Sequence, residues 1–363
     1  MNKRHKNALL GVLLIIVASV VLFFVFVTVA DYRPDLIETV DVTGNGNRRL
    51  EQGDTIKIST WNIGYAGLGA SEDFFMDDGQ QSRPKDQSIV KKYMDGILET
   101  IETIDTEITM LQEADLYSKR SYYLNQLEKI AGLKSDESYS FAKNYDVKFV
   151  PVPFPPLGRI KSGIATFSEF NLIKSTRYAF EGNYSWPKST VMLDRCFMVS
   201  RVNLVDSEED LILVNAHFSA YDDGSLRASQ LAAIKEFMIE AYNAGNYVII
   251  GGDWNQTFEF IDTEAFPIYE EGKFYLPSVI KNDWLEEGWQ WAIDENTPTY
   301  RLLNTAYVEG ETQVGIIDGF LVSPNIEVKS IETLGLEFKD SDHNPVIGTF
   351  QLKKMINKKA AND

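Results

Sequence analysis

Cysteine and histidine are scarce in this sequence of 363 residues, which contains one cysteine and three histidines. The single cysteine, Cys196, excludes an intramolecular disulfide and any cysteine cluster for zinc or an iron–sulfur centre. Because Cys196 lies in an apolar stretch, we expect a buried, inert thiol and not a nucleophile. The sequence also lacks G-x-S-x-G, the nucleophile turn that many serine hydrolases use.

Positive charge is also in short supply, since 35 Lys and Arg residues face 53 Asp and Glu residues and the formal net charge is −18. Such an acidic chain is a poor candidate for tight, nonspecific binding of a polyanion. Hydrophobic residues make up 44% of the chain and aromatic residues 12%, which is enough for a globular protein with a large core.

Only one stretch, residues 8–30, is long and apolar enough to cross a bilayer of about 30 Å. Basic residues precede it and acidic residues follow it, so the positive-inside rule predicts a cytoplasmic segment 1–7 and an extracellular remainder. That remainder is more acidic still, about −21, because three of the basic residues and none of the acidic ones come before the anchor. A cleaved signal peptide is the alternative, since Thr28 and Ala30 are small residues before Asp31, but the run exceeds the usual apolar region of such peptides.

Beyond the anchor we expect a polar stalk at 31–54, one globular domain at 55–352 and a polar tail at 353–363. Apolar periodicity predicts helices at 89–104, 121–131 and 226–241, and strands at 56–61, 108–111, 163–167, 172–175, 196–202, 211–215, 247–250, 315–322 and 345–350. The three strands between 163 and 202 are expected to form a meander. The segment 258–291 does not resolve into elements.

A proline-rich loop interrupts this pattern at residues 150–158, because four prolines remove hydrogen-bond donors and fix φ. It carries Phe154 and lies next to the basic residues Arg159 and Lys161. An apolar loop tip beside basic residues could contact a membrane or a substrate, or it could pack over the edge of its own domain.

Polar side chains follow the predicted strands at the points where they end. The clearest case is YVIIGGDWNQT at 247–257, where Asp253 and Asn255 lie just beyond a buried strand, the place where α/β sheets hold ligands. Similar positions belong to Asn62, Glu113, His217, Asp342 and His343. Both histidines of the predicted extracellular part belong to this set. Such a grouping of both histidines with polar residues at strand ends is not expected by chance. Asp318, flanked by apolar residues, is expected to be a buried and partnered charge, and Arg195 is a candidate phosphate contact.

Two histidines cannot build a three-histidine zinc centre. Oxygen donors such as Glu113, Asn62 and Asp342 suit a hard cation instead, with Mg²⁺ preferred and Mn²⁺ or Ca²⁺ as alternatives.

Six short motifs, in this order, resemble the endonuclease/exonuclease/phosphatase superfamily: WN at 61–62, LQE at 111–113, NAHF at 215–218, GGDWN at 251–255, IDG at 317–319 and SDH at 341–343. The resemblance implies an α/β fold, a four-layer α/β/β/α sandwich of two packed mixed sheets, here preceded by one transmembrane helix. It also implies metal-dependent hydrolysis of phosphate esters.

By this resemblance Glu113 is the main metal ligand, assisted by Asn62 and Asp342. Asp253 orients or deprotonates the attacking water, and Asn255 holds a phosphoryl oxygen. His217, and His343 polarised by Asp318, donate hydrogen bonds to developing oxyanions or a proton to the leaving group. Such groups offset the negative charge that builds up during in-line attack.

The expected activity is therefore hydrolysis of a phosphodiester at the outer membrane face. The acidic charge favours a lipid-borne or small substrate over duplex nucleic acid, with Arg159 and Arg195 as substrate contacts. Two alternatives are an extracellular endonuclease, such as a deoxyribonuclease, and a catalytically silent, membrane-tethered binding module. The sequence does not indicate an oligomeric state.

Overall fold

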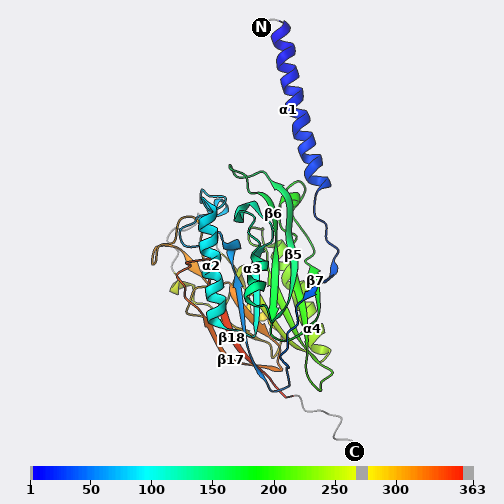
Figure 1. The fold of residues 1–363 in the computed structure, drawn as a ribbon, viewed down its shortest axis with the longest axis vertical. Coiled ribbons are helices and arrows are strands. Elements are labelled where there is room, and N and C mark those ends of the chain that lie inside the picture. The colour runs from blue at the N-terminus through cyan, green and yellow to red at the C-terminus, as the bar shows by residue number, and fades with distance from the viewer. Residues whose placement is uncertain (1–2, 267–276, 355–363) are drawn as a thin grey trace, which may run out of the picture.

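Two seven-stranded mixed sheets form the centre of the protein in a computed structural model that describes residues 3–266 and 277–354 (Figure 1). The first sheet has the order β1 (Ile37–Val40), β7 (Leu172–Ala179), β8 (Cys196–Asn203), β9 (Asp210–His217), β10 (Tyr247–Asp253), β16 (Asp318–Val322) and β13 (Gln290–Ala292). The second has the order β17 (Ile326–Thr333), β18 (Val346–Leu352), β3 (Thr55–Asn62), β4 (Ile108–Asp115), β6 (Gly158–Ser168), β5 (Ser138–Val150) and β2 (Val42–Thr43). The outer part of the predicted tail, residues 355–363, and part of the segment 258–291 lie outside the described residues.

The sheets pack face to face through a core that both contribute. Ile58 and Met110 of the second sheet belong to one buried cluster with Leu213 and Ile249 of the first. Three helices cover the outer faces, with α2 (Gln87–Ile104) and α3 (Gln126–Leu133) on the second sheet and α4 (Ser225–Asn243) on the first. The expected four-layer α/β/β/α sandwich is therefore confirmed.

Local sequence explains why the covering helices form. In α2 the buried residues recur at three- and four-residue intervals, so one face of the helix is apolar. Asp86 caps its first turn by accepting hydrogen bonds from the backbone N–H groups of Ser88 and Ile89. The predicted helix at 121–131 begins later, at Gln126, because the side chain of Asn125 caps it by accepting a hydrogen bond from the N–H of Glu128.

One helix, α1 (Lys3–Val29), extends away from the sandwich (Figure 1). It is long and apolar enough to cross a membrane, a property that a signal sequence shares. Most of its side chains are exposed. The predicted apolar segment is thus helical over nearly its whole length.

The expectation of a polar stalk at 31–54 is corrected for residues 37–50, which join the two sheets. Strand β1 pairs with β7 at the edge of the first sheet, and β2 pairs with β5 at the edge of the second. Isolated bridges then join Arg48 to Phe170 and Leu50 to Leu204. A strand at the edge of a sheet has unpaired backbone groups, and β1 and β2 pair with such groups of β7 and β5. These partners lie more than 90 residues away along the chain. A local hydrophobic pattern cannot reveal such distant pairing.

The expected meander between residues 163 and 202 was also wrong, although its three strands exist. Strand β6 belongs to the second sheet, whereas β7 and β8 pair in the first. The short link between β6 and β7 therefore crosses from one sheet to the other. Alternating burial predicts a strand but does not identify the sheet that the strand joins.

Asp194, just before β8, is a partly buried acid whose ionisation is expected to lower the stability of the fold. Burial, and then the nearby Asp31, raise the pKa of Asp194 to about 7, although Arg177 acts in the opposite direction. Because folding raises the pKa of this acid above its unfolded value of about 3.9, its contribution to stability falls as the pH rises from about 4 to about 7. We expect Asp194→Asn to raise the melting temperature of the full chain in detergent by about 2–4 °C at pH 8 and hardly at pH 4.

The control is Asp136→Asn, since Asp136 is exposed in the turn before β5. Thermal unfolding followed by circular dichroism at both pH values measures the effect. Equal melting temperatures for wild type and Asp194→Asn at pH 8 would contradict the assignment.

Candidate active site

The carboxyl ends of four strands meet at one edge of the sandwich and deliver four of the predicted site residues. Strands β3 and β4 are parallel neighbours in the second sheet, and β9 and β10 are parallel neighbours in the first. Their ends carry Asn62, Glu113, His217 and Asp253. Parallel strands end at the same edge, and the face-to-face packing of the two sheets brings the two pairs together.

Two glycines make the end of β10 compact. A Cβ on Gly252 would collide with the backbone oxygen of Ala216 on the neighbouring strand β9. The backbones of β9 and β10 therefore approach each other closely at Gly252. It holds Asp253 directly opposite His217 in the sheet register.

Asp253 lies at the centre of the site and is almost completely buried. Its Oδ1 accepts a hydrogen bond of 2.9 Å from the backbone N–H of Asn255, and its Oδ2 accepts one of 3.0 Å from Asn62 Nδ2. The same Oδ2 lies 3.3 Å from His217 Nε2 and 3.9 Å from His343 Nε2. Burial, followed by the neighbouring Asp318, raises the pKa of Asp253 to a range where a carboxyl group can exchange a proton near neutral pH.

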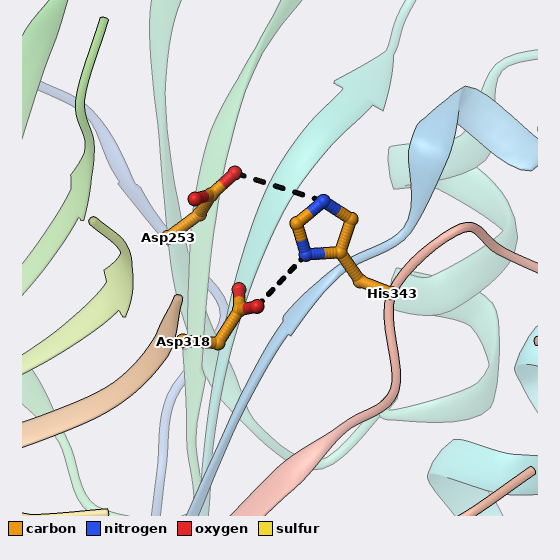
Figure 2. A group of neighbouring side chains, drawn as sticks. All are labelled: Asp253, Asp318 and His343. Carbon is orange, nitrogen blue, oxygen red and sulfur yellow. Dashed lines mark hydrogen bonds and ion pairs between the residues drawn. The ribbon is translucent and has the colours of Figure 1, made fainter. Parts of the chain in front are cut away.

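His343 lies between two acids, as Figure 2 shows. Its Nδ1 is 2.9 Å from Asp318 Oδ2, while its Nε2 points toward Asp253. Burial alone lowers the pKa of His343, but Asp318 and Asp253 outweigh it and hold the pKa well above the usual range. The two acids therefore favour the imidazolium form of the ring, and the expectation of a buried, partnered Asp318 agrees with this geometry.

The pKa of His217 is shifted in the opposite direction to that of His343. Burial, and then the positive charges of Arg195 and His343, hold the pKa of His217 well below its usual range. Its Nδ1 is buried and has no hydrogen-bond partner among the described residues. The surroundings thus favour the charged form of His343 and the neutral form of His217, the two imidazoles beside Asp253.

Glu113 sits at an irregularity in β4, where the pairing with β6 shifts register between Leu111 and Ala114. Its φ of 57° is unusual for a residue with a side chain and costs about 1–3 kcal/mol, the kind of strain that is found at functional sites. Its Oε1 has only long contacts, 3.4 Å to Asn62 Nδ2 and 3.9 Å to His217 Nε2. The carboxylate of Glu113 is partly exposed, and none of these contacts is a short hydrogen bond.

Asp342 comes from the loop before β18 and lines the same cavity as Glu113. Burial raises the pKa of Asp342 to about 6, and Glu113 adds to the effect. A buried carboxyl group whose charged form is disfavoured beside a second carboxylate fits a hard divalent cation, because the charge of the cation would stabilise the ionised form.

The side chain of Asn62 is oriented differently from a metal ligand. Its Oδ1 accepts a hydrogen bond from the backbone N–H of Gly64, and its Nδ2 faces Glu113 and Asp253. Ligand atoms of Asp253, Asp318 and His343 also lie close enough together to hold a metal ion. The His343 imidazolium already supplies positive charge there, so the pair Glu113 and Asp342 suits a cation better.

A cavity opens beside these groups and has both charged and apolar walls. Arg195 lines it and donates one long hydrogen bond, 3.5 Å, to the backbone oxygen of His217. No carboxylate of residues 3–266 and 277–354 lies within ion-pair distance of Arg195. Asn255 also lines the cavity, with its Nδ2 bound to the backbone oxygen of Phe218. The apolar part includes Phe74, Met76, Leu157, Met192 and Leu193.

The structure does not bring Arg159 to this cluster, so the expectation that it contacts substrate is corrected. Arg159 is absent from the residues that line the cavity, and its guanidinium forms an ion pair with Asp146 and a hydrogen bond to the backbone oxygen of Ile160. The carboxylate of Asp146 holds it at the side of the β5–β6 hairpin.

Two arginines of the cavity wall were not predicted. Arg120 forms an ion pair of 3.0 Å with Asp115, lies over the ring of Tyr65 and reaches 4.0 Å from Glu113 Oε2. Arg301 is buried and donates hydrogen bonds to backbone oxygens of residues 68, 69, 72, 302 and 305. The sequence signal that could have indicated Arg120 is Asp115, an acidic residue close after the LQE motif, because a buried carboxylate needs a positively charged partner.

Comparison with known proteins agrees with this architecture. The sequence model described as the Endonuclease/Exonuclease/phosphatase family matches residues 59–343. No curated protein matches the chain.

Solved structures with similar folds include an endonuclease/exonuclease/phosphatase from Beutenbergia cavernae, with 15% identity, 84% of this chain and 72% of that chain covered, and a TM-score of 0.54. The endonuclease/exonuclease/phosphatase from Bacteroides vulgatus has 16% identity, coverage of 83% and 100%, and a TM-score of 0.52. The TDP2 of D. rerio, complexed with single strand DNA product, has 15% identity, coverage of 82% and 99%, and a TM-score of 0.51. At these identities the likeness concerns the fold.

Proposed function

Because the chain belongs to the endonuclease/exonuclease/phosphatase family, we propose that it is a divalent-metal-dependent hydrolase of a phosphodiester, anchored at the outer face of the cell membrane. Members of this family are typically metal-dependent hydrolases of phosphoester bonds. The observation that carries the proposal is the position of Asp253 between His217, His343 and Asn62, beside the open carboxylate of Glu113.

In the proposed reaction, Asp253 orients a water molecule and takes its proton as the water oxygen bonds to phosphorus. The bond from phosphorus to the leaving oxygen breaks in line, and that oxygen takes up a proton, for which the His343 imidazolium is a source. His217 and Asn255 donate hydrogen bonds to the phosphoryl oxygens, on which negative charge develops. Asp318 keeps His343 charged and correctly oriented.

Glu113 and Asp342 would hold the cation, Mg²⁺ first and Mn²⁺ or Ca²⁺ as alternatives, and Asn62 would assist by fixing the carboxylates. When bound, the metal supplies Lewis-acid stabilisation of the phosphoryl charge. Arg120, which lies near Glu113, would limit the net negative charge of this corner before the cation binds.

Arg195 is the proposed contact for the substrate phosphate, since its guanidinium lines the cavity and a guanidinium forms strong hydrogen bonds with phosphate. We expect Arg195→Ala to raise KM for a phosphodiester by at least about tenfold, the equivalent of one charge-assisted hydrogen bond. Arg159→Ala is the matched control, because Arg159 is bound to Asp146 away from the cavity. Steady-state kinetics of both variants measure this, and similar KM values for the two would exclude the assignment.

Two features support a lipid-borne or small substrate over duplex DNA. The chain has a net charge of −18, whereas duplex binding depends on neutralised phosphates. Apolar side chains such as Leu157 and Met192 line the cavity close to the polar cluster. The second candidate is an extracellular endonuclease, which the fold shared with TDP2 in its single strand DNA complex favours. A silent binding module is disfavoured because every predicted catalytic group is present.

The anchoring is a separate prediction. We expect the full chain to stay in the membrane fraction after carbonate extraction, since α1 is long enough to span the hydrocarbon core. Protease added to intact cells should remove the domain. A mature chain that begins near Asp31 and is released into the medium would show that α1 acts as a signal peptide.

The substrate class is tested by offering the purified full chain, in detergent with Mg²⁺, several phosphoesters in parallel. These are plasmid DNA, vesicles of sphingomyelin or other phospholipids, and inositol phosphates, and the Asp253→Asn variant is the blank. We expect turnover of a phospholipid or a small phosphodiester. Rapid nicking of the plasmid at physiological salt without lipid turnover would contradict this and favour the endonuclease.

A further inference from the structure

We infer that the domain docks on the same bilayer that holds α1, through a surface formed by residues 184–188 and by the tip of the β5–β6 hairpin, residues 149–157. We call this surface the docking rim. It presents the catalytic cavity to lipid headgroups of the leaflet from which the chain emerges. The inference rests on the proposed anchoring and deepens the proposed function, because it names a membrane lipid as the substrate class.

The end of α1 contacts the docking rim directly. The ring of Phe24 lies 5.5 Å from the ring of Trp186, and Trp186 Nε1 donates a hydrogen bond of 3.1 Å to Thr28 Oγ1. If Ala8 marks the cytoplasmic edge of the hydrocarbon, about 20 residues at 1.5 Å each carry the helix across some 30 Å to the region of Val27. Thr28 and Trp186 then lie at the water interface, where tryptophan is enriched in membrane proteins.

The connection between α1 and the domain is short and held at several points, which fixes the side of the domain that faces the membrane. The ammonium group of Lys143 lies 3.9 Å from the ring centroid of Tyr32, and Arg177 donates to the backbone oxygen of Asp35. Strand β1 starts at Ile37, only eight positions after the last residue of α1. A domain tied this closely cannot turn its opposite end toward the bilayer.

The β5–β6 hairpin projects from this same end of the domain, toward the side from which α1 leaves (Figure 1). Strand β4 ends where Asp115 pairs with Ser162, but β5 and β6 continue to pair as far as Val150 and Gly158. The hairpin therefore extends past the edge where the catalytic residues lie.

Its tip is apolar and exposed, with 95% of Phe154 and 54% of Val152 accessible. Trp186 is 59% exposed despite its contact with α1. Large side chains at such exposure are costly in water but insert favourably at a lipid surface. Lys148 and Lys188, both exposed, lie next to these apolar residues and suit the headgroup layer.

Apolar packing links the docking rim to the catalytic cavity. Tyr145 of β5 donates a hydrogen bond of 2.9 Å to the backbone oxygen of Val191, which joins the hairpin to the segment that follows Trp186. Leu157 and Leu193 pack in the same cluster and also line the cavity. A lipid whose phosphodiester enters the cavity can thus keep its hydrocarbon part against apolar side chains that lead to the bilayer.

The docking is tested with the full chain in phosphatidylcholine vesicles. A Phe154→Cys variant carries an environment-sensitive nitrobenzoxadiazole label, and nitroxide-bearing lipids report proximity by quenching. The matched control is Asp136→Cys, an exposed site at the opposite end of the 13-residue strand β5. Wild type serves as the labelling blank, because Cys196 is buried.

We expect a blue-shifted label with at least about twofold quenching at position 154, and an unquenched label at position 136. Labels that are equally unquenched at both positions would overturn the inference. This readout needs no catalysis, so it separates the docking from the proposed enzymatic function.

A kinetic test then asks whether docking delivers lipid to the site. The double variant Trp186→Ser, Phe154→Ser alters only exposed side chains outside the catalytic cluster. We expect at least about tenfold lower turnover of phospholipid in vesicles and unchanged kcat and KM on a water-soluble nitrophenyl phosphodiester. Equal losses on both substrates, or none on lipid, would contradict the inference. Absence of all activity in wild type, with quenching at position 154 intact, would count against the proposed function alone.

Discussion

Asp253→Asn should lower the turnover of a phosphodiester by at least about a hundredfold and leave the fold unchanged. General base catalysis by a positioned side chain contributes about 10²–10⁴, and the amide of asparagine cannot accept a proton from water. Asparagine has the same shape, and its single oxygen can retain one of the two hydrogen bonds that Asp253 accepts, either from the Asn255 backbone N–H or from Asn62 Nδ2. The measurement is kcat at saturating substrate and Mg²⁺, together with the melting temperature.

A matched substitution separates chemistry from charge. Asp283→Asn removes one negative charge at an exposed position outside the cavity and should leave kcat unchanged. If Asp253→Asn retained more than about a tenth of wild-type turnover, Asp253 would not be the group that accepts the proton.

Glu113→Gln should raise the Mg²⁺ concentration for half-maximal activity by at least about tenfold, because even the loss of an outer-shell partner costs 10–100-fold in metal affinity. The neutral amide keeps one oxygen but not the charge that binds a cation. High Mg²⁺ should therefore restore much of the turnover, in contrast to Asp253→Asn. Titration of activity with Mg²⁺ measures the shift, and isothermal calorimetry on the same samples measures metal affinity directly.

The control for this experiment is Glu259→Gln, whose carboxylate pairs with Lys281 at the surface. Its Mg²⁺ requirement should match that of wild type. A Glu113→Gln enzyme with an unaltered Mg²⁺ requirement would move the cation away from Glu113, and the cluster of Asp253, Asp318 and His343 would become the next candidate.

The structure brings most of the predicted site residues together, because they lie at strand ends or in loops next to them. Buried strands are recognisable from short apolar runs, and the polar residue that ends each run then lies at the edge of the sheet. The convergence of Glu113 from one sheet and Asp253 from the other follows from face-to-face packing. The four-layer fold was predictable by resemblance to a family with the same order of motifs.

Other features depend on contacts that sequence patterns do not encode. Arg120 and Arg301 are ordinary arginines in the sequence, and their burial depends on Asp115 and on backbone oxygens of distant loops. Arg159 was predicted to contact the substrate, but its guanidinium forms an ion pair with Asp146. The edge strand β1 was not recognised in its polar segment, because its partner β7 lies far along the chain.

The most direct test of the central claim is the release of nitrophenol from bis(4-nitrophenyl) phosphate by the full chain, measured with Mg²⁺, after addition of a chelator, and after Mg²⁺ is restored. The account predicts activity that the chelator abolishes and that excess Mg²⁺ recovers, with Asp253→Asn inactive throughout. Hydrolysis that persists at the same rate in the chelator, or that Asp253→Asn retains in full, would contradict a metal-dependent phosphodiesterase with its active site at Asp253.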